Sequence, residues 1–179
     1  MLWRDELLDQ LDFYWDHQFM PRLWGLTDEE CFWEPVADCW SVRAGADGAP
    51  AIDWQWPVPD PPPVTTIAWR IAHIAVPVFG VRASQHFGDG SLAFTSERWP
   101  APATADQAFS QLTEHHRAWR DGLLSLDEDQ LRAPVGEAEG PWAQSPMATL
   151  VLHLNREVMH HGAEIALLRD LYRAGFTGS

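Results

Sequence analysis

Residues 147–174 hold a carboxylate and an imidazole one helical turn apart, a pattern that can bind a metal ion. Glu157 and His161 are four positions apart, and His160 precedes His161. At about 100° per residue, His161 points along the centre of an apolar stripe, Glu157 lies about 40° from that centre, and His153 and His160 lie roughly 80–100° away. The stripe consists of Met147, Leu150, Leu154, Val158, Ile165, Leu168 and Tyr172.

A glutamate that faces a helical core needs a partner, because an unpaired buried charge is costly. Glu157 and His161 could satisfy one another, or Glu157 could pair with Arg70. Alternatively, both side chains could ligate one divalent metal ion, as often occurs in the cores of helical bundles. The spacing alone leaves these interpretations open.

A metal site would need a third ligand from another helix, and His73 is the best candidate. The segment around His73 is apolar on nearly all sides, so its periodicity does not orient the side chain. A core histidine with an ordinary hydrogen bond is the alternative. His115 and His116 are further candidates, and His116 lies in the apolar stripe of its own helix. His17 and His86 are near predicted helix ends and are expected to face solvent.

The elements that must position these residues are helices. Capping residues and prolines predict four long ones, with a possible kink at Pro21 in the first and a bend at Pro77 in the second. They cover residues 2–24, about 65–88, 105–124 and 146–174, with caps at Thr65 or Thr66, at Thr104 and at Ser145. Shorter helical pieces follow Thr27 and Ser125. The pattern predicts an all-α, up-down four-helix bundle with long Pro-rich connecting loops, in a single domain over residues 1–179.

The connection over residues 44–63 is unusually long. It contains Trp54, Trp56 and five prolines between 57 and 63, which exclude helix and most sheet. Long loops in small domains are often functional. The two tryptophans either dock on the bundle as a surface excursion or form the wall of a pocket. Residues 89–103 and 133–144 are further connections, and no strand pattern competes with the helices.

The composition excludes several classes of partner. The formal net charge is -14 and the chain has no lysine, which argues against binding to nucleic acids and to anionic membranes. No apolar run approaches the ~20 residues that span a bilayer, and the acidic first residues do not resemble a signal peptide. Cys31 and Cys39 are expected to be reduced, partly buried thiols in a cytoplasmic protein.

Three segments resemble motifs of the DinB-like superfamily, which includes the mycothiol-dependent maleylpyruvate isomerase and related thiol transferases. The first is Leu-Thr-Asp-Glu-Glu at 26–30, followed by Glu-Pro at 34–35 and Trp-Ser-Val at 40–42. The second is Ile-Ala-Trp-Arg-Ile-Ala-His-Ile at 67–74, and the third is His-Gly-Ala-Glu-Ile at 161–165 with Leu-Arg at 168–169. The resemblance covers nearly the whole chain.

The resemblance implies a metal site formed by His73, Glu157 and His161. Its isomerase-like branch carries Glu-x-x-x-His on the last helix, which Glu157 and His161 match. If His160 replaced His161, Arg156 would take the place of Glu157, and an arginine cannot ligate a metal. Two imidazoles and a carboxylate suit zinc, nickel or ferrous iron and leave coordination positions open. His153, His160 and Glu164 would orient the ligands or would be ordinary polar residues at the edge of the stripe.

By the same resemblance, the expected function is transfer or isomerisation with mycothiol or a similar small thiol. The metal would lower the pKa of the thiol, and loop 44–63 could cover an apolar or electrophilic substrate. The alternatives are a metal-dependent hydrolase, a non-catalytic bundle that binds a metal or small ligand, and a homodimer whose main role is the partner contact. The chain itself would be a monomer or a homodimer.

Overall fold

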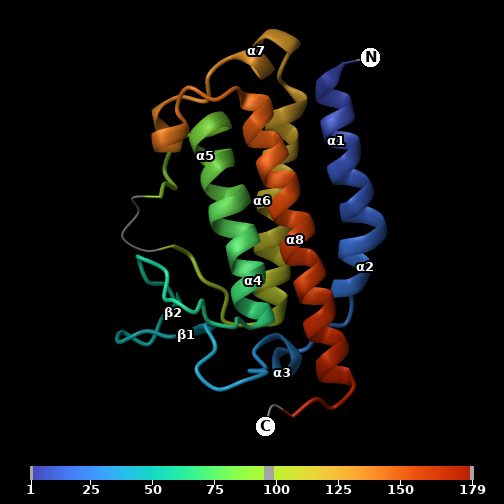
Figure 1. Ribbon diagram of the computed structural model, residues 1–179, viewed down its shortest axis with the longest axis vertical. Helices are drawn as coiled ribbons and strands as arrows, with labels where there is room; N and C mark the ends of the chain where they lie inside the picture. The colour runs from blue at the N-terminus through green and yellow to red at the C-terminus, as the bar shows by residue number, and fades with distance from the viewer. Residues whose placement is uncertain (1, 95–98, 178–179) are drawn as a thin grey trace.

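Four helical columns pack side by side along the long axis of the molecule (Figure 1). The computed structural model describes residues 2–94 and 99–177, so positions 95–98 of the predicted 89–103 connection lie outside it. In chain order the columns are α1 (Trp3–Tyr14), a π-helical turn (Trp15–Phe19) and α2 (Met20–Leu23); α4 (Ile67–His73), a π-helical turn (Ile74–Gly80) and α5 (Val81–Phe87); α6 (Ala105–Leu124); and α8 (Met147–Arg173). The predicted all-α bundle is confirmed.

Three shorter helical elements connect the columns. They are α3 (Asp28–Cys31), α7 (Glu128–Arg132) and a 3₁₀ segment (Glu137–Trp142). Across the described ranges, no helix is both long enough and apolar enough to cross a membrane.

The two middle columns run in the same direction. His115 of α6 contacts Ala75 in the π-helical turn of the second column, and Trp119 of α6 packs against Phe87 at the end of that column. The later residue of α6 contacts the later residue of the second column, so α6 is parallel to α4–α5. The chain must therefore return along the bundle between Phe87 and Ala105 (Figure 1). Strict up-down alternation therefore stops at this pair. A long connection makes the parallel arrangement possible, since a short one joins only antiparallel neighbours.

A π-helical turn directly follows His73 and contains Pro77. Proline has no N–H and its ring clashes with the carbonyl four residues earlier, so a wider turn relieves the bend that the sequence predicted. The carbonyl of Ala75 in this turn accepts a hydrogen bond from Nδ1 of His115, at 2.8 Å. His115 therefore serves the packing of two helices.

The helix caps follow the predictions in part. Thr27 and Thr66 accept hydrogen bonds from backbone N–H groups in the first turns of α3 and α4, as expected. Asp127 caps α7 in place of the expected Ser125, and it forms a full capping box. Pro146 occupies the N-cap of α8 without a side-chain hydrogen bond, so the predicted cap at Ser145 is wrong.

The 44–63 region is not entirely irregular. Strands β1 (Val42–Ala44) and β2 (Pro50–Ile52) form a small antiparallel hairpin in which Val42 pairs with Ile52. The sequence pattern does not predict this hairpin, because strands of three residues are too short to show alternation of apolar and polar residues.

A buried ion pair fixes the end of α8. The Arg169 side chain is 1% exposed, and its Nε and Nη2 atoms each lie 2.8 Å from a different carboxylate oxygen of Glu30 in α3. The guanidinium also donates to the carbonyl of Trp24. Because the Glu30 side chain bonds Arg169, α3 has the Thr27 cap without the reciprocal bond of a capping box.

We expect Arg169→Met to lower the free energy of unfolding by about 3 kcal/mol, because it leaves the Glu30 carboxylate buried with one exposed arginine as its remaining partner. Urea denaturation measures the change. Arg132→Met is the matched control, since Arg132 pairs with carboxylates in solvent. Its cost should stay below about 1 kcal/mol, and an equal cost for both variants would contradict the assignment.

His116 is a core residue, as its place in the apolar stripe suggested. Its ring stacks on Trp15 at a centroid distance of 3.6 Å and contacts Phe79 edge-on. Burial lowers the pKa of His116 to about 4, and its Nε2 atom has no hydrogen-bond partner among the described residues. The folded protein therefore holds this imidazole neutral.

This burial predicts a pH-dependent stability. Between pH 6.5 and about 4 the unfolded chain binds a proton at His116 and the folded chain does not, so the free energy of unfolding falls as the pH is lowered through this window. The contribution of His116 to this slope fades as the pH rises above 6.5. We expect His116→Phe to reduce the stability difference between pH 7 and pH 5 by about 2 kcal/mol in urea denaturation. An unchanged difference would show that His116 titrates normally.

Candidate metal centre

Three side chains from two helices converge near the middle of the bundle. His73 is the last residue of α4, and Glu157 and His161 lie one turn apart on α8. Oε2 of Glu157 is 3.6 Å from Nε2 of His73 and 3.3 Å from Nε2 of His161. One donor atom from each residue lies within 4.8 Å of the other two. The structure therefore resolves the orientation of His73, which its sequence left open.

The donor set fits a divalent ion. Two donors that each lie about 2.1 Å from a tetrahedral ion are about 3.4 Å apart, which matches the observed separations. The fit is supported by Nε2 of His73, which is buried and has no hydrogen-bond partner among the described residues. A buried ring nitrogen that faces a carboxylate and a second imidazole, yet bonds neither, is well placed to bind a cation.

Glu164 and Arg70 orient His161. Nδ1 of His161 lies 2.7 Å from Oε2 of Glu164, and that oxygen also accepts from Nη1 of Arg70, at 2.8 Å. Nη1 of Arg70 also lies 2.9 Å from Nδ1, so Arg70 and Glu164 meet at the same ring nitrogen. In the tautomer whose Nδ1 proton bonds Glu164, the lone pair of Nε2 faces Glu157, as in the carboxylate–histidine–metal arrangement. Arg70 thus pairs with Glu164, so its predicted alternative pairing with Glu157 is wrong.

The pKa shifts favour the protonation states that a metal needs. Burial lowers the pKa of His73, so the ring stays neutral at pH 7. The adjacent imidazoles of His161 and His73 hold the pKa of the Glu157 carboxyl far below its usual range. A neutral imidazole and an ionised carboxylate are the ligating forms of these groups.

A row of tryptophans leads from the 44–63 loop to His73. The ring of Trp69 stacks on His73 at a centroid distance of 5.2 Å, Trp40 packs on Trp69, and Trp54 packs on Trp40. Nε1 of Trp69 donates to the carbonyl of Asp53, which ties the loop to α4. Trp54 therefore packs at the outer end of this row and stays 51% exposed, whereas Trp56 is 80% exposed. The sequence did not predict the stacking of Trp69 on His73, because an α4 that is apolar on nearly all sides gives no direction for either ring.

The adjacent His160 points differently from His161. Its side chain is 65% exposed, and its Nε2 atom is 3.4 Å from Oε1 of Glu164. His160, His161 and Glu164 form a second possible group of ligands, with all three residues on α8. The group that includes His73 is better enclosed and joins two helices. His153 lies on the other side of Glu157, with Nδ1 3.6 Å from Oε1.

The two cysteines are free and buried, as expected. Burial raises the pKa of Cys31 to about 12 and also raises the pKa of Cys39. Neither thiol is therefore ionised near pH 7, and any thiolate nucleophile would have to come from a ligand.

Fold and site together define a four-helix bundle that carries a candidate divalent-metal centre between its second and fourth columns. The family model of the DinB superfamily matches residues 10–165, and the chain belongs to this superfamily, whose members often bind divalent metals. No match was found among curated proteins or among solved structures.

We expect Glu157→Gln to abolish zinc binding, measured by calorimetry on metal-free protein. Glu164→Gln should weaken zinc binding by about 10–100-fold, because it removes the acceptor that orients His161. His160→Ala is the control and should leave the affinity within about threefold. If His160→Ala removed the metal while Glu157→Gln did not, the second group of ligands would be the site.

Proposed function

We propose that this protein is a metal-dependent enzyme that uses a low-molecular-weight thiol, such as mycothiol, for transfer or isomerisation of an electrophilic substrate. His73, Glu157 and His161 would hold the ion, which we expect to be zinc, nickel or ferrous iron. The observation that carries the proposal is a set of three converging protein donors among the described residues, one of them a buried nitrogen without a hydrogen-bond partner there. Three donors leave coordination positions for an exogenous ligand.

A bound divalent ion supplies charge that stabilises a thiolate at neutral pH. The chain's own residues prepare this site. Glu164 and Arg70 fix the ring of His161, and Trp69 covers one face of His73 and keeps water from it. Glu157 lies between the two imidazoles, which supports a role as a ligand and not as a free general base.

The protein's charge and cysteines are consistent with a small-molecule partner. The net charge of -14 disfavours nucleic acids, and the high pKa of Cys31 leaves the nucleophile to be supplied from outside. We propose an apolar or electrophilic second substrate and a cytoplasmic location, where such thiols are reduced. The protein would act as a monomer or a homodimer.

A thiol titration tests the proposal. Cobalt-substituted protein should develop a sulfur-to-cobalt charge-transfer band when mycothiol is added, and the metal-loaded protein should accelerate conjugation of the thiol with monobromobimane. Glu157→Gln should lose both signals. Arg117→Gln, an exposed change on α6, should retain them. A metal-loaded protein that shows no band and no acceleration would contradict thiol activation. Thiol-independent hydrolysis of an ester would favour a hydrolase instead.

A further inference from the structure

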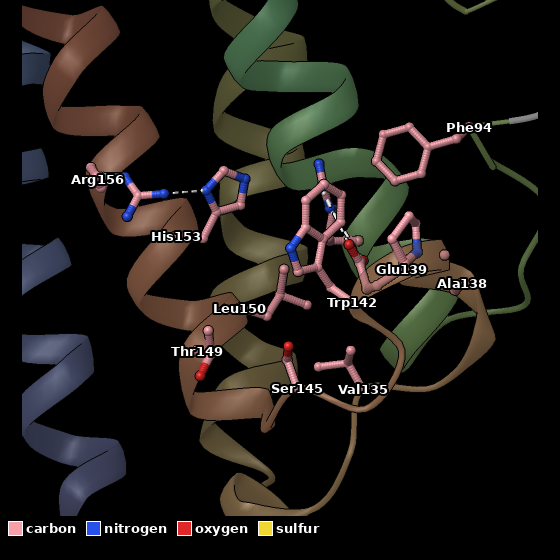
Figure 2. Close-up of a pocket in the computed structure, with 13 residues that line it drawn as sticks. Phe94, Val135, Ala138, Glu139, Trp142, Ser145, Thr149, Leu150, His153 and Arg156 are labelled. Carbon is pink, nitrogen blue, oxygen red and sulfur yellow. Dashed lines mark hydrogen bonds and ion pairs between the residues drawn. The ribbon is translucent and has the colours of Figure 1, made fainter.

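A cavity of about 580 Å³ lies along the first half of α8 (Figure 2). It is bounded by the first half of α8, by the 3₁₀ segment before α8 and by α5. Its volume is in the range of small-molecule pockets. Its lining was not singled out as a unit by the sequence, because the residues come from segments far apart in the chain.

The walls of the cavity are mainly apolar. Val135 and Leu150 are buried and contribute aliphatic surface, and Trp142 places a largely exposed indole at the opening. Phe94 lies on the side opposite α8, as Figure 2 shows. An apolar or aromatic body of moderate size therefore finds hydrophobic contacts from several directions.

One arginine at the cavity is already neutralised. Arg82 forms a bidentate pair with Glu139, with both distances 3.3 Å. His86 also bonds Glu139, with Nε2 3.0 Å from Oε1. The His86 side chain is only 6% exposed, so the expectation that it faces solvent is wrong. Arg82 and Glu139 line one wall of the cavity, and their ion pair carries little net charge.

Arg156 is different. It is exposed on α8 and lines the same cavity, and its one hydrogen bond within the described ranges is from Nη2 to Nδ1 of His153, at 2.9 Å. No carboxylate of the described residues forms an ion pair with it. In Figure 2 Arg156 and His153 lie together on the α8 side of the cavity. The cavity thus combines apolar walls with one cation that forms no ion pair with a carboxylate of the described residues.

We propose that this cavity binds a small amphipathic organic anion, with its apolar or aromatic body against Leu150 and Trp142 and its carboxylate or sulfonate at Arg156. A guanidinium pairs well with such planar or trigonal anions through charge-assisted hydrogen bonds. His153 separates the cavity from Glu157, at 3.6 Å. Binding itself does not depend on the metal, and only the use of this ligand as the electrophilic reactant rests on the proposed function.

Two fluorescent probes of the same ring system test the proposal. Anilinonaphthalene sulfonate carries the anion, and phenylnaphthylamine lacks it. We expect metal-free wild-type protein to bind one equivalent of the sulfonate. Arg156→Gln should weaken the sulfonate about tenfold and change the neutral probe less than twofold. Arg117→Gln makes the same charge change on exposed α6 and should affect neither probe.

A cavity-filling variant locates the binding. Ser145→Trp introduces a large side chain at a lining position outside α8 and should weaken both probes in protein whose circular dichroism matches wild type. The proposal would be overturned if Arg156→Gln and Arg117→Gln lost sulfonate affinity equally. It would also be overturned if Arg156→Gln bound the sulfonate like wild type. If Ser145→Trp is folded and binds both probes normally, the probes bind elsewhere and the cavity is refuted.

Glu157→Gln separates this proposal from the metal-dependent function. This variant should lose metal but bind the sulfonate like wild type. Sulfonate binding in a protein that never binds metal would refute the proposed enzyme and leave the cavity assignment in place. Metal and thiol binding without any probe binding would refute the cavity assignment and leave the proposed enzyme in place.

Discussion

The packing at the centre of this bundle depends on pairing the negative charge of the Glu157 carboxylate. A charge held between helices must be paired or it destabilises the fold. Here the partners come from a second helix and from the next turn of the same helix, so α4 and α8 must approach closely and in one register. The tryptophan row and the Arg70–Glu164 pair then hold the two imidazoles in place.

Three partly or fully buried carboxylates in this fold are compensated in different ways. Glu30 is matched by Arg169 through two hydrogen bonds, and Glu139 is matched by Arg82 and His86. Both sites are complete with protein groups alone. Oε2 of Glu157 lies 3.3 Å from Nε2 of His161 and 3.6 Å from Nε2 of His73, and the His73 nitrogen has no hydrogen-bond partner among the described residues. This difference separates a structural ion pair from a site that can accept a cation.

The candidate centre and the neighbouring cavity share α8 as a common wall. His161 and Glu157 are on the side that meets α4, whereas His153 and Arg156 border the cavity. The same helix can thus hold an ion at one level and contact an organic ligand one to two turns away. The π-helical turn after His73 belongs to this arrangement, because it alters the path of the facing helix directly beyond a candidate ligand.

The sequence by itself determined the helices and the direction of His161. Helical periodicity places that residue in the apolar stripe and His160 outside it, and the structure shows the same contrast in exposure. The capping threonines Thr27 and Thr66 were identifiable because a cap is a local hydrogen bond within one turn. Resemblance to a family, and not periodicity, selected His73.

Only the tertiary structure decided which distant residues meet. The helix around His73 is apolar on nearly all sides, so no local pattern could predict that its ring faces α8. Three other features also depend on how the helices pack. Arg70 pairs with Glu164 and not with Glu157, and His86 is buried against Glu139. The two middle columns run parallel. Local rules act over one or two turns of a helix, whereas these contacts join residues tens of positions apart. Their geometry exists only once the bundle has formed.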